Sequence, residues 1–485
     1  MKRVYWAAAL AAVACLSVQA RADVKPFALF GDGMALQQGV KCPVWGTADP
    51  GEEVSAGIGT GEANAVASPP VKADKDGRWM LQMATVQPGG PYTLTLHGKN
   101  TVTIKDVYVG EVWVASGQSN MEMALKDCAG GPEEIAKSKN PKIRLFKVSN
   151  RISAEPTTEL TGKWVECGPD TVANFSGVAY YFGRDLQKAR NVPVGLIESN
   201  WGGTVAEAWT PKANLEANPD LKKLIPAEIK IDKQHPNPNQ GTALFNGMIN
   251  PLLPFAIKGV IWYQGESNAG SLDQAYQYRT LFPTMIQGWR EQWNNPDMPF
   301  LFVQLAPYNH NPKELVDTPW AELREAQLLT SEKVKNTGMA VITDVGDENN
   351  IHPKRKEAVG GRLALAALAI GYGEKIVYSG PIYEGVKIDG NKAVLSFRSL
   401  GQGLEAKDGP LTGFTMAGED KKFHEAKAEI KGDTVVVTCD AVDKPAAVRF
   451  GWTNTPVVNL FNKDGLPASP FRTDDFALST QPKTR

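Results

Sequence analysis

The sequence predicts an α/β protein, in which a parallel sheet with helices on both faces is flanked by a β-rich module at each end. In the middle of the chain, apolar strand-like runs alternate with helical patterns, which is typical of a parallel sheet. Residues 23–106 and 376–485 instead contain short alternating runs separated by turn residues. With 485 residues the chain is also too long for one ordinary domain, so we expect two or three.

The first 22 residues have the composition of a signal peptide. Lys2 and Arg3 form a positive start, an apolar run covers residues 4–18, and Ala20-Arg21-Ala22 fits the rule for cleavage between small residues. We therefore expect a mature chain that begins at Asp23 and is exported, to the periplasm or outside the cell. The apolar run is too short to span a membrane comfortably, and we expect no span elsewhere.

The two terminal modules are predicted to be all-β. Tyr92-Thr93-Leu94-Thr95-Leu96 alternates polar and apolar residues, and residues 23–106 as a whole indicate a small sandwich. In residues 376–485, Gly390-Asn391 marks a turn between two strands, and residues 434–438 are rich in valine.

The central region, residues 107–375, is predicted to contain the catalytic domain. Its strands and helices are expected to alternate along the chain. The expected strands cover residues 107–115, 192–197, 258–263, 299–305 and 338–342, and the expected helices cover residues 244–252, 273–293, 320–334 and 354–369.

The run Gly117-Gln118-Ser119-Asn120-Met121 follows the first central strand directly. A sharp turn there would hold the Ser119 hydroxyl at the carboxyl edge of the sheet, where open α/β folds bind ligands. Ser119 is thus a candidate nucleophile. The run is not the Gly-x-Ser-x-Gly elbow, because Met121 stands at the second glycine position. Alternatively, Ser119 only caps a helix over residues 121–125.

Other polar segments follow three further strands, at residues 201–204, 264–268 and 351–353. Parallel strands would bring these segments to one edge together with Ser119. The backbone N–H groups of Gly202 and Gly203 can approach an oxyanion closely, and Gln264 can add a side-chain N–H. Together with a base, these groups are the set that acyl transfer requires.

Histidine is the side chain that titrates near neutral pH, and the chain has five of them. His352 is the favoured base, because its loop opens the last central helix and has carboxylates just upstream. His310 also follows a central strand and remains a rival.

The charge balance and the cysteines argue against several classes of protein. Lys and Arg number 52 against 53 Asp and Glu, so no bias toward nucleic acid or membranes exists. Past residue 22, the cysteines are sparse and lack metal-ligand spacing, so we expect neither a metal nor another cofactor. The sequence does not decide whether Cys128 and Cys167 form a disulfide.

Several of these segments resemble the sialate O-acetylesterase family of the SGNH-hydrolase superfamily. The resemblance covers essentially the whole mature chain and implies a flavodoxin-like α/β/α domain with serine esterase activity on O-acetylated carbohydrates. The segments that carry it are Gly117-Gln118-Ser119-Asn120-Met121, Trp201-Gly202-Gly203-Thr204, Trp262-Tyr263-Gln264-Gly265-Glu266-Ser267-Asn268, Ile351-His352-Pro353 and residues 465–473.

The resemblance also implies roles for individual residues. Ser119 would be the nucleophile and its N–H the first oxyanion donor, and Gly202 or Gly203 would give the second. Gln264 would stand where other SGNH enzymes use Asn, and His352 would be the base, which decides against His310.

Two further expectations concern the surroundings of these groups. Asn120 and Glu266 are expected to contact the substrate. The usual Asp three residues before the histidine is Asn349 here, so the group that orients the imidazole is expected to be Asp347, with Asp344 or a backbone carbonyl as alternatives.

The expected function is therefore removal of O-acetyl groups from sugars through an acyl-enzyme, with O-acetylated sialic acid as the substrate that the resemblance implies. Esterases that act on acetylxylan or other plant glycans are an alternative. A glycan-binding protein without turnover and, less favoured, a protease or lipase are alternatives from other classes. The sequence does not fix the oligomeric state.

Overall fold

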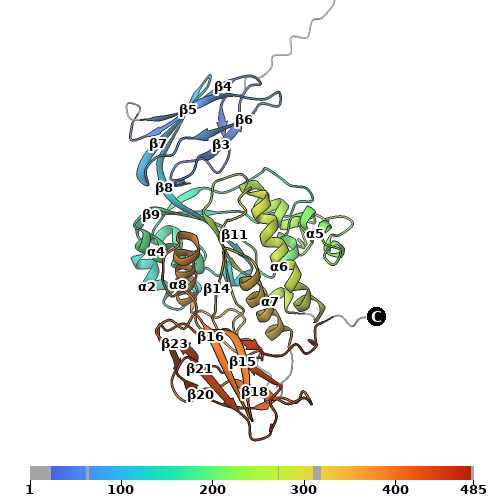
Figure 1. Cartoon of the computed structure of the whole chain (residues 1–485). Coiled ribbons are helices and arrows are strands. Elements are labelled where there is room, and N and C mark those ends of the chain that lie inside the picture. The colour runs from blue at the N-terminus through green and yellow to red at the C-terminus, as the bar shows by residue number, and fades with distance from the viewer. Residues whose placement is uncertain (1–22, 62–64, 271, 310–317, 482–485) are drawn as a thin grey trace, which may run out of the picture.

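The computed structural model describes residues 23–61, 65–270, 272–309 and 318–481. Figure 1 shows a β-rich N-terminal module, a central α/β part and a β-rich C-terminal module that follow one another along the long axis of the molecule. The predicted signal peptide (residues 1–22) and the rival histidine, His310, lie outside the described residues.

The central sheet has the strand order β10-β9-β11-β8-β12-β13-β14. All neighbours pair in parallel except β10, which is antiparallel to β9. This arrangement confirms the predicted α/β fold class. The strands are β8 (Thr101–Gly117), β9 (Asn140–Lys147), β10 (Trp164–Cys167), β11 (Val194–Asn200), β12 (Gly259–Tyr263), β13 (Phe300–Val303) and β14 (Thr337–Ala340).

Helices cover both faces of this sheet (Figure 1). The helices α4 (Gly177–Arg190) and α8 (Lys356–Ala366) share one apolar core with their face of the sheet. The helices α6 (Leu272–Gln292) and α7 (Pro319–Lys333) pack in the core on the opposite face. The expected helix over residues 244–252 is a π-helical turn followed by a 3₁₀ turn.

The helix ends have local causes. The Ser176 hydroxyl accepts the Ala179 N–H at the start of α4, and the Thr318 hydroxyl accepts the Ala321 N–H at the start of α7. Asn191 ends α4 in the left-handed conformation, at φ 52°. The shorter helices are α1 (Ser119–Glu122), α2 (Gly131–Lys137), α3 (Pro169–Val172) and α5 (Lys212–Ala217).

The N-terminal module is joined to the central sheet through a single strand. The first part of β8 pairs with β7, and its last part pairs with β11 and β12. The predicted domain boundary after residue 106 thus falls inside one continuous strand. The other strands of the module are β1 (Lys25–Pro26), β2 (Ala35–Gln37), β3 (Cys42–Thr47), β4 (Glu53–Gly59), β5 (Val66–Lys72), β6 (Arg78–Met83) and β7 (Gly89–His97).

The C-terminal module contains two four-stranded sheets and one strand pair, β17-β23. Its last residues return to the central part, where the buried Glu322 carboxylate of α7 accepts hydrogen bonds from Ser479 and Thr480. The strands are β15 (Ile382–Asp389), β16 (Lys392–Arg398), β17 (Leu404–Ala406), β18 (Phe414–Ala417), β19 (His424–Glu425), β20 (Lys427–Lys431), β21 (Thr434–Thr438), β22 (Ala447–Phe450), β23 (Leu460–Asn462) and β24 (Phe471–Arg472).

The sequence left undecided whether Cys128 and Cys167 form a disulfide. In the structure both are free and buried, as are Cys42 and Cys439. Among the described residues, no cluster of His, Cys, Asp and Glu has the geometry to hold a metal ion. Nor does the described part of the chain contain a helix long and apolar enough to cross a membrane.

Candidate active site

Ser119 lies on a sharp turn at the carboxyl end of β8. Gly117 adopts a φ of 136°, and a Cβ at this position would lie 2.2 Å from the Tyr263 carbonyl oxygen, so only glycine fits. Gln118 then donates its N–H to the same carbonyl at 3.0 Å, and α1 starts at Ser119. The turn places Ser119 at the edge of the sheet, as the sequence predicts.

The Ser119 hydroxyl meets the imidazole of His352, which is 233 residues further along the chain. Ser119 Oγ and His352 Nε2 are 2.7 Å apart, which is hydrogen-bond distance. Burial, and to a smaller extent the positive charge of Lys356, lower the pKa of His352 below its usual value. The imidazole is therefore neutral near neutral pH, in the form that can accept a proton.

A buried polar network lies directly behind this pair. Asn120 Nδ2 donates to Glu266 Oε1 at 2.5 Å and to the Ile351 carbonyl at 2.8 Å, and Asn120 Oδ1 accepts from Lys356 Nζ at 2.5 Å. Because Ile351 precedes His352, the network joins the serine turn to the histidine loop.

The network corrects two predictions. Asn120 and Glu266, expected to contact the substrate, are buried with exposed fractions of 0% and 5%, and neither lines the cleft described below. Burial lowers the pKa of Lys356 to about 8 and raises the pKa of Glu266, although each opposes the other's shift by its charge. Both residues lie behind the Ser119–His352 pair. Sequence reasoning did not single out Lys356, four residues after His352.

The backbone N–H groups near Ser119 differ in their availability. Those of Ser119 and Gly203 have no acceptor among the described residues, whereas the Gly202 N–H donates to Glu122 Oε2 at 2.7 Å. A Cβ at residue 202 would lie 3.3 Å from Ser119 Cβ, so this glycine permits close approach of the two loops. Sequence reasoning missed Glu122, although its position one helical turn after Ser119 is a signal.

Gln264 is wrong as a predicted oxyanion donor. Its amide is fully buried and donates to the Thr204 carbonyl at 3.1 Å and to Asn268 Oδ1 at 2.6 Å. Its oxygen accepts the Tyr278 hydroxyl at 2.9 Å. Both N–H groups of the side chain are thus occupied, and Gln264 instead ties the β12 loop to the β11 loop.

The two carboxylates upstream of His352 also have other partners. Asp347 Oδ1 accepts the Asn349 N–H at 3.0 Å, and Asp344 forms an ion pair with Arg362 at 2.6 Å. Within the described part of the chain, His352 Nδ1 has no hydrogen-bond partner. The contacts therefore do not support Asp347 as the group that orients the imidazole. The backbone N–H of His352 donates to Asn350 Oδ1 at 2.9 Å, which fixes the loop.

Ser119 and His352 open onto a cleft of about 510 Å³. Two lysines lie in its wall: Lys147 pairs with the buried Glu198 at 2.8 Å, whereas Lys126 is exposed and has no ion pair within the described residues. None of the described residues that line the cleft is an arginine. The lining residues are Ser119, Glu122, Met123, Ala124, Lys126, Asp127, Lys147, Asn174 and His352.

A parallel sheet with a hydrogen-bonded serine and histidine at its carboxyl edge is an arrangement found in serine hydrolases with α/β folds. Comparison with known families narrows this class: residues 109–369 match the family described as carbohydrate esterase, sialic acid-specific acetylesterase. The chain belongs to this family and is a carboxylic ester hydrolase.

Relatives of known identity support the assignment over most of the chain. The sialate O-acetylesterase of Homo sapiens is 30% identical over 469 residues, which cover 88% of each chain. The Mus musculus enzyme is 28% identical, over 88% of this chain and 90% of its own. A solved carbohydrate acetylesterase from Xanthomonas citri is 40% identical, with a TM-score of 0.85 over 93% of this chain and all of its own. These relatives set aside the alternative of a binding protein without turnover.

Proposed function

We propose that the protein removes O-acetyl groups from sialic acids, with Ser119 as the nucleophile and His352 as the general base. The observation that carries these roles is the 2.7 Å contact between Ser119 Oγ and His352 Nε2. The pKa of His352, lowered mainly by burial, supports a neutral imidazole ready to take the hydroxyl proton.

In the first half of the reaction, Ser119 Oγ attacks the acetyl carbonyl carbon while His352 Nε2 takes its proton. The bond between that carbon and the sugar oxygen then breaks, and the imidazolium returns the proton to the departing oxygen, which leaves as the sugar hydroxyl. In the second half, water attacks the acetyl-serine with His352 again as base, and acetate and free Ser119 are released.

The tetrahedral intermediates carry an oxyanion, which needs fixed N–H donors. We assign this role to the Ser119 and Gly203 N–H groups, because neither has an acceptor among the described residues. The Gly202 N–H is occupied by Glu122, so it would serve only if that carboxylate moved. Loss of one such donor typically lowers kcat by about 10²–10³-fold.

Lys126 supports an acidic sugar as substrate. Its ammonium is exposed at the cleft and, within the described residues, has no carboxylate partner, so it is available to pair with the carboxylate of a sialic acid. A neutral substrate such as acetylated xylan would gain nothing from this charge, although the remaining cleft residues would accept it.

Acetate release from acetylated sialic acid, acetylated xylan and acetylated pectin tests the proposal. We expect the sialic acid to have the highest kcat/KM. Lys126→Met should raise its KM by roughly fivefold, the value of a partly exposed ion pair, and leave the rate on acetylated xylan unchanged. Lys139→Met, another exposed lysine, is the matched control. A preference for xylan that Lys126→Met does not alter would overturn the sialic acid assignment and leave the esterase assignment intact.

Export belongs to the same proposal. Residues 1–22 carry the signal-peptide pattern of a positive start, an apolar run and a small-residue cleavage site. N-terminal sequencing of the protein expressed in its host should give Asp23 as the first residue. A mature protein that retains Met1 or Lys2 would contradict cleavage.

A further inference from the structure

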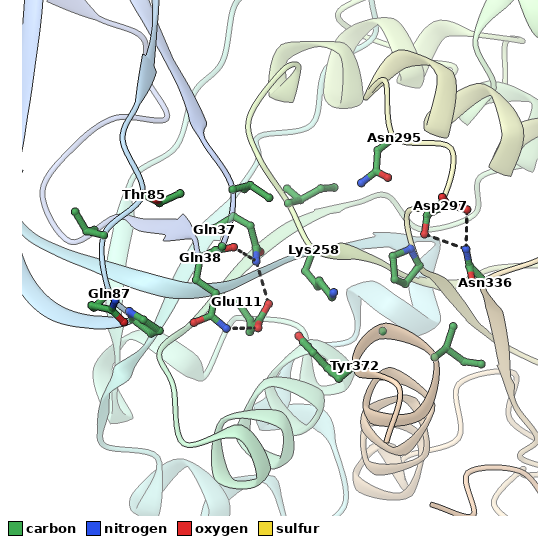
Figure 2. Close-up of a pocket in the computed structure, with 18 residues that line it drawn as sticks. Gln37, Gln38, Thr85, Gln87, Glu111, Lys258, Asn295, Asp297, Asn336 and Tyr372 are labelled. Carbon is green, nitrogen blue, oxygen red and sulfur yellow. Dashed lines mark hydrogen bonds between the residues drawn. The ribbon is translucent and has the colours of Figure 1, made fainter. Parts of the chain in front are cut away.

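A second large cavity, of about 760 Å³, lies between the N-terminal module and the central sheet. Its central-sheet wall contains Glu111 of β8 and residues that precede β12, β13 and β14, so it lies at the amino ends of the parallel strands (Figure 2). Ser119 follows the opposite end of β8. Gly117 lies six positions after Glu111 on the strand, or roughly 20 Å away. The cavity is therefore distinct from the catalytic cleft.

The N-terminal module supplies two amide side chains that are held in fixed positions. Gln37 Nε2 donates to Glu111 Oε2 at 3.0 Å, and Gln38 Nε2 donates to Glu111 Oε1 at 2.5 Å, as Figure 2 shows. Gln37 Oε1 accepts the Val112 N–H at 2.8 Å. Glu111 is 2% exposed, so these amide donors take the place of water around its carboxylate. Gln38 Oε1 is buried and has no donor among the described residues.

The facing wall adds one ammonium group and one amide that have no polar side-chain partner. Lys258 is half-buried, lies 4.8 Å from the centre of the Tyr372 ring, and has no carboxylate partner within the described part of the chain. Its backbone N–H donates to the Val112 carbonyl at 2.7 Å, which fixes the base of the side chain. The Asn295 side chain makes no hydrogen bond with the described residues. Figure 2 shows both residues around the same opening.

The composition of the lining indicates the class of ligand. Amides and a single ammonium group match the hydroxyl and ring oxygens of a sugar, each of which can donate or accept. The charged lining residues are Lys258, Glu111 and Asp297, which leaves an excess of one negative charge and disfavours an anionic ligand. The Tyr372 ring is already in contact with Arg190 and Lys258, so recognition is by hydrogen bonds.

We propose that this cavity is an accessory binding site for a neutral stretch of glycan chain. Such a site would hold the carrier of the acetylated sugar away from the scissile bond. By raising the local concentration of chains near the catalytic cleft, it would lower the KM for long substrates and leave small esters unaffected. The proposal assumes an esterase that acts on glycans, but the binding that it predicts needs no turnover.

Calorimetric titration of the Ser119→Ala protein tests the site without hydrolysis. The probes are xylohexaose, mannohexaose, galactohexaose and lacto-N-tetraose as neutral chains, with sialyllactose as the anionic comparison. The variants are Lys258→Met, which keeps the aliphatic part of the side chain, and Asn295→Ala, which loses no side-chain hydrogen bond seen in the structure. Lys444→Met, in the C-terminal module, is the matched control.

We expect at least one neutral chain to bind, and each cavity variant to weaken that binding about tenfold, as expected for a lost hydrogen bond to a charged or fixed polar group. The control should bind like the parent. In the background with Ser119 intact, both cavity variants should hydrolyse p-nitrophenyl acetate normally and show a raised KM on acetylated polysaccharide.

Two results would overturn the accessory site: no binding by any neutral chain, or binding that neither cavity variant weakens. Normal p-nitrophenyl acetate hydrolysis by the proteins with Ser119 intact would then still agree with the proposed catalytic roles. Conversely, glycan binding to this cavity would be detected by calorimetry whether or not Ser119→Ala abolishes hydrolysis.

Discussion

At the scale of single residues, Lys356 is the charged group that links the buried network to the proposed base. Its Nζ contacts Asn120, and its charge is the second cause, after burial, of the lowered pKa of His352. A lower pKa keeps His352 neutral, and thus active as a base, down to a lower pH. The position of the acidic limb of the pH–rate profile therefore reports on this charge.

Lys356→Met should raise the pKa of His352 and move the acidic limb of kcat/KM to higher pH. The measurement is the pH profile with p-nitrophenyl acetate, with Lys354→Met, an exposed lysine on the same loop, as control. A lowered kcat with an unmoved limb would mean that Lys356 acts only by holding the loop.

Asp347 gives a second prediction at this scale. Because its carboxylate accepts the Asn349 N–H and does not contact His352, Asp347→Asn should lower kcat by less than about tenfold. Loss of an orienting carboxylate lowers kcat by about 10⁴-fold in serine proteases. A fall of that size here would show that Asp347 reaches the imidazole during turnover.

At the scale of elements, the turn after β8 depends on one glycine. Gly117→Ala combines an unfavourable φ with a Cβ only 2.2 Å from the Tyr263 carbonyl oxygen. We expect a loss of roughly 2 kcal/mol or more in unfolding free energy, together with reduced esterase activity. Gly31→Ala, where a Cβ would meet nothing within 4 Å, is the control for thermal unfolding. Equal melting temperatures for the two variants would contradict this account of the turn.

The sequence predicted the strands that carry the site, because their apolar runs are clear and polar turns follow them. It did not predict β9 or α4. The strand β9 begins with the turn-forming residues Asn140 and Pro141 and the charged Lys142, so its apolar part is short, and α4 begins at a glycine. Ser176 and Asn191 do mark the two ends of α4, so the sequence prediction missed this helix although its end signals are present.

Only part of the candidate site could likewise be predicted from the sequence. Ser119 and His352 could be placed from chemistry and strand order. The partners of Gln264, Asn120 and Glu266 could not, because a segment's position at the edge does not say whether its side chains point into the cleft or behind it. All three point behind it and connect loops that meet only in the folded chain.

At the scale of the whole molecule, a buried charge cluster fastens the C-terminal module to α7. Asp474 accepts hydrogen bonds from Arg449 at 2.9 Å and from Arg472 at 3.1 Å, and Arg472 also pairs with Glu325 of α7 at 2.8 Å. Burial alone would raise the pKa of Asp474, but the hydrogen bonds and charges of Arg449 and Arg472 lower it.

Asp474→Asn should therefore lower the unfolding free energy by about 1.5–3 kcal/mol, because Arg449 and Arg472 lose the charged acceptor between them while Arg472 keeps its pair with Glu325. In the wild type, a lowered folded-state pKa means that this contribution is present above the unfolded pKa, about 3.9, and is lost as pH falls below it. Urea titration at neutral and acidic pH measures both effects. Asp440→Asn, in an exposed pair with Lys427, is the control and should change little. An Asp474 variant as stable as that control would contradict the fastening role.

The most direct test of the catalytic account is p-nitrophenyl acetate hydrolysis by the wild type, Ser119→Ala and His352→Ala, with peptide mapping for an acetyl group on Ser119 after rapid acid quench. We predict that each substitution lowers kcat by at least about 10⁴-fold and that acetyl appears on Ser119 of the wild type alone. Wild-type rates in the Ser119→Ala protein, or acetyl found only on another residue, would contradict it.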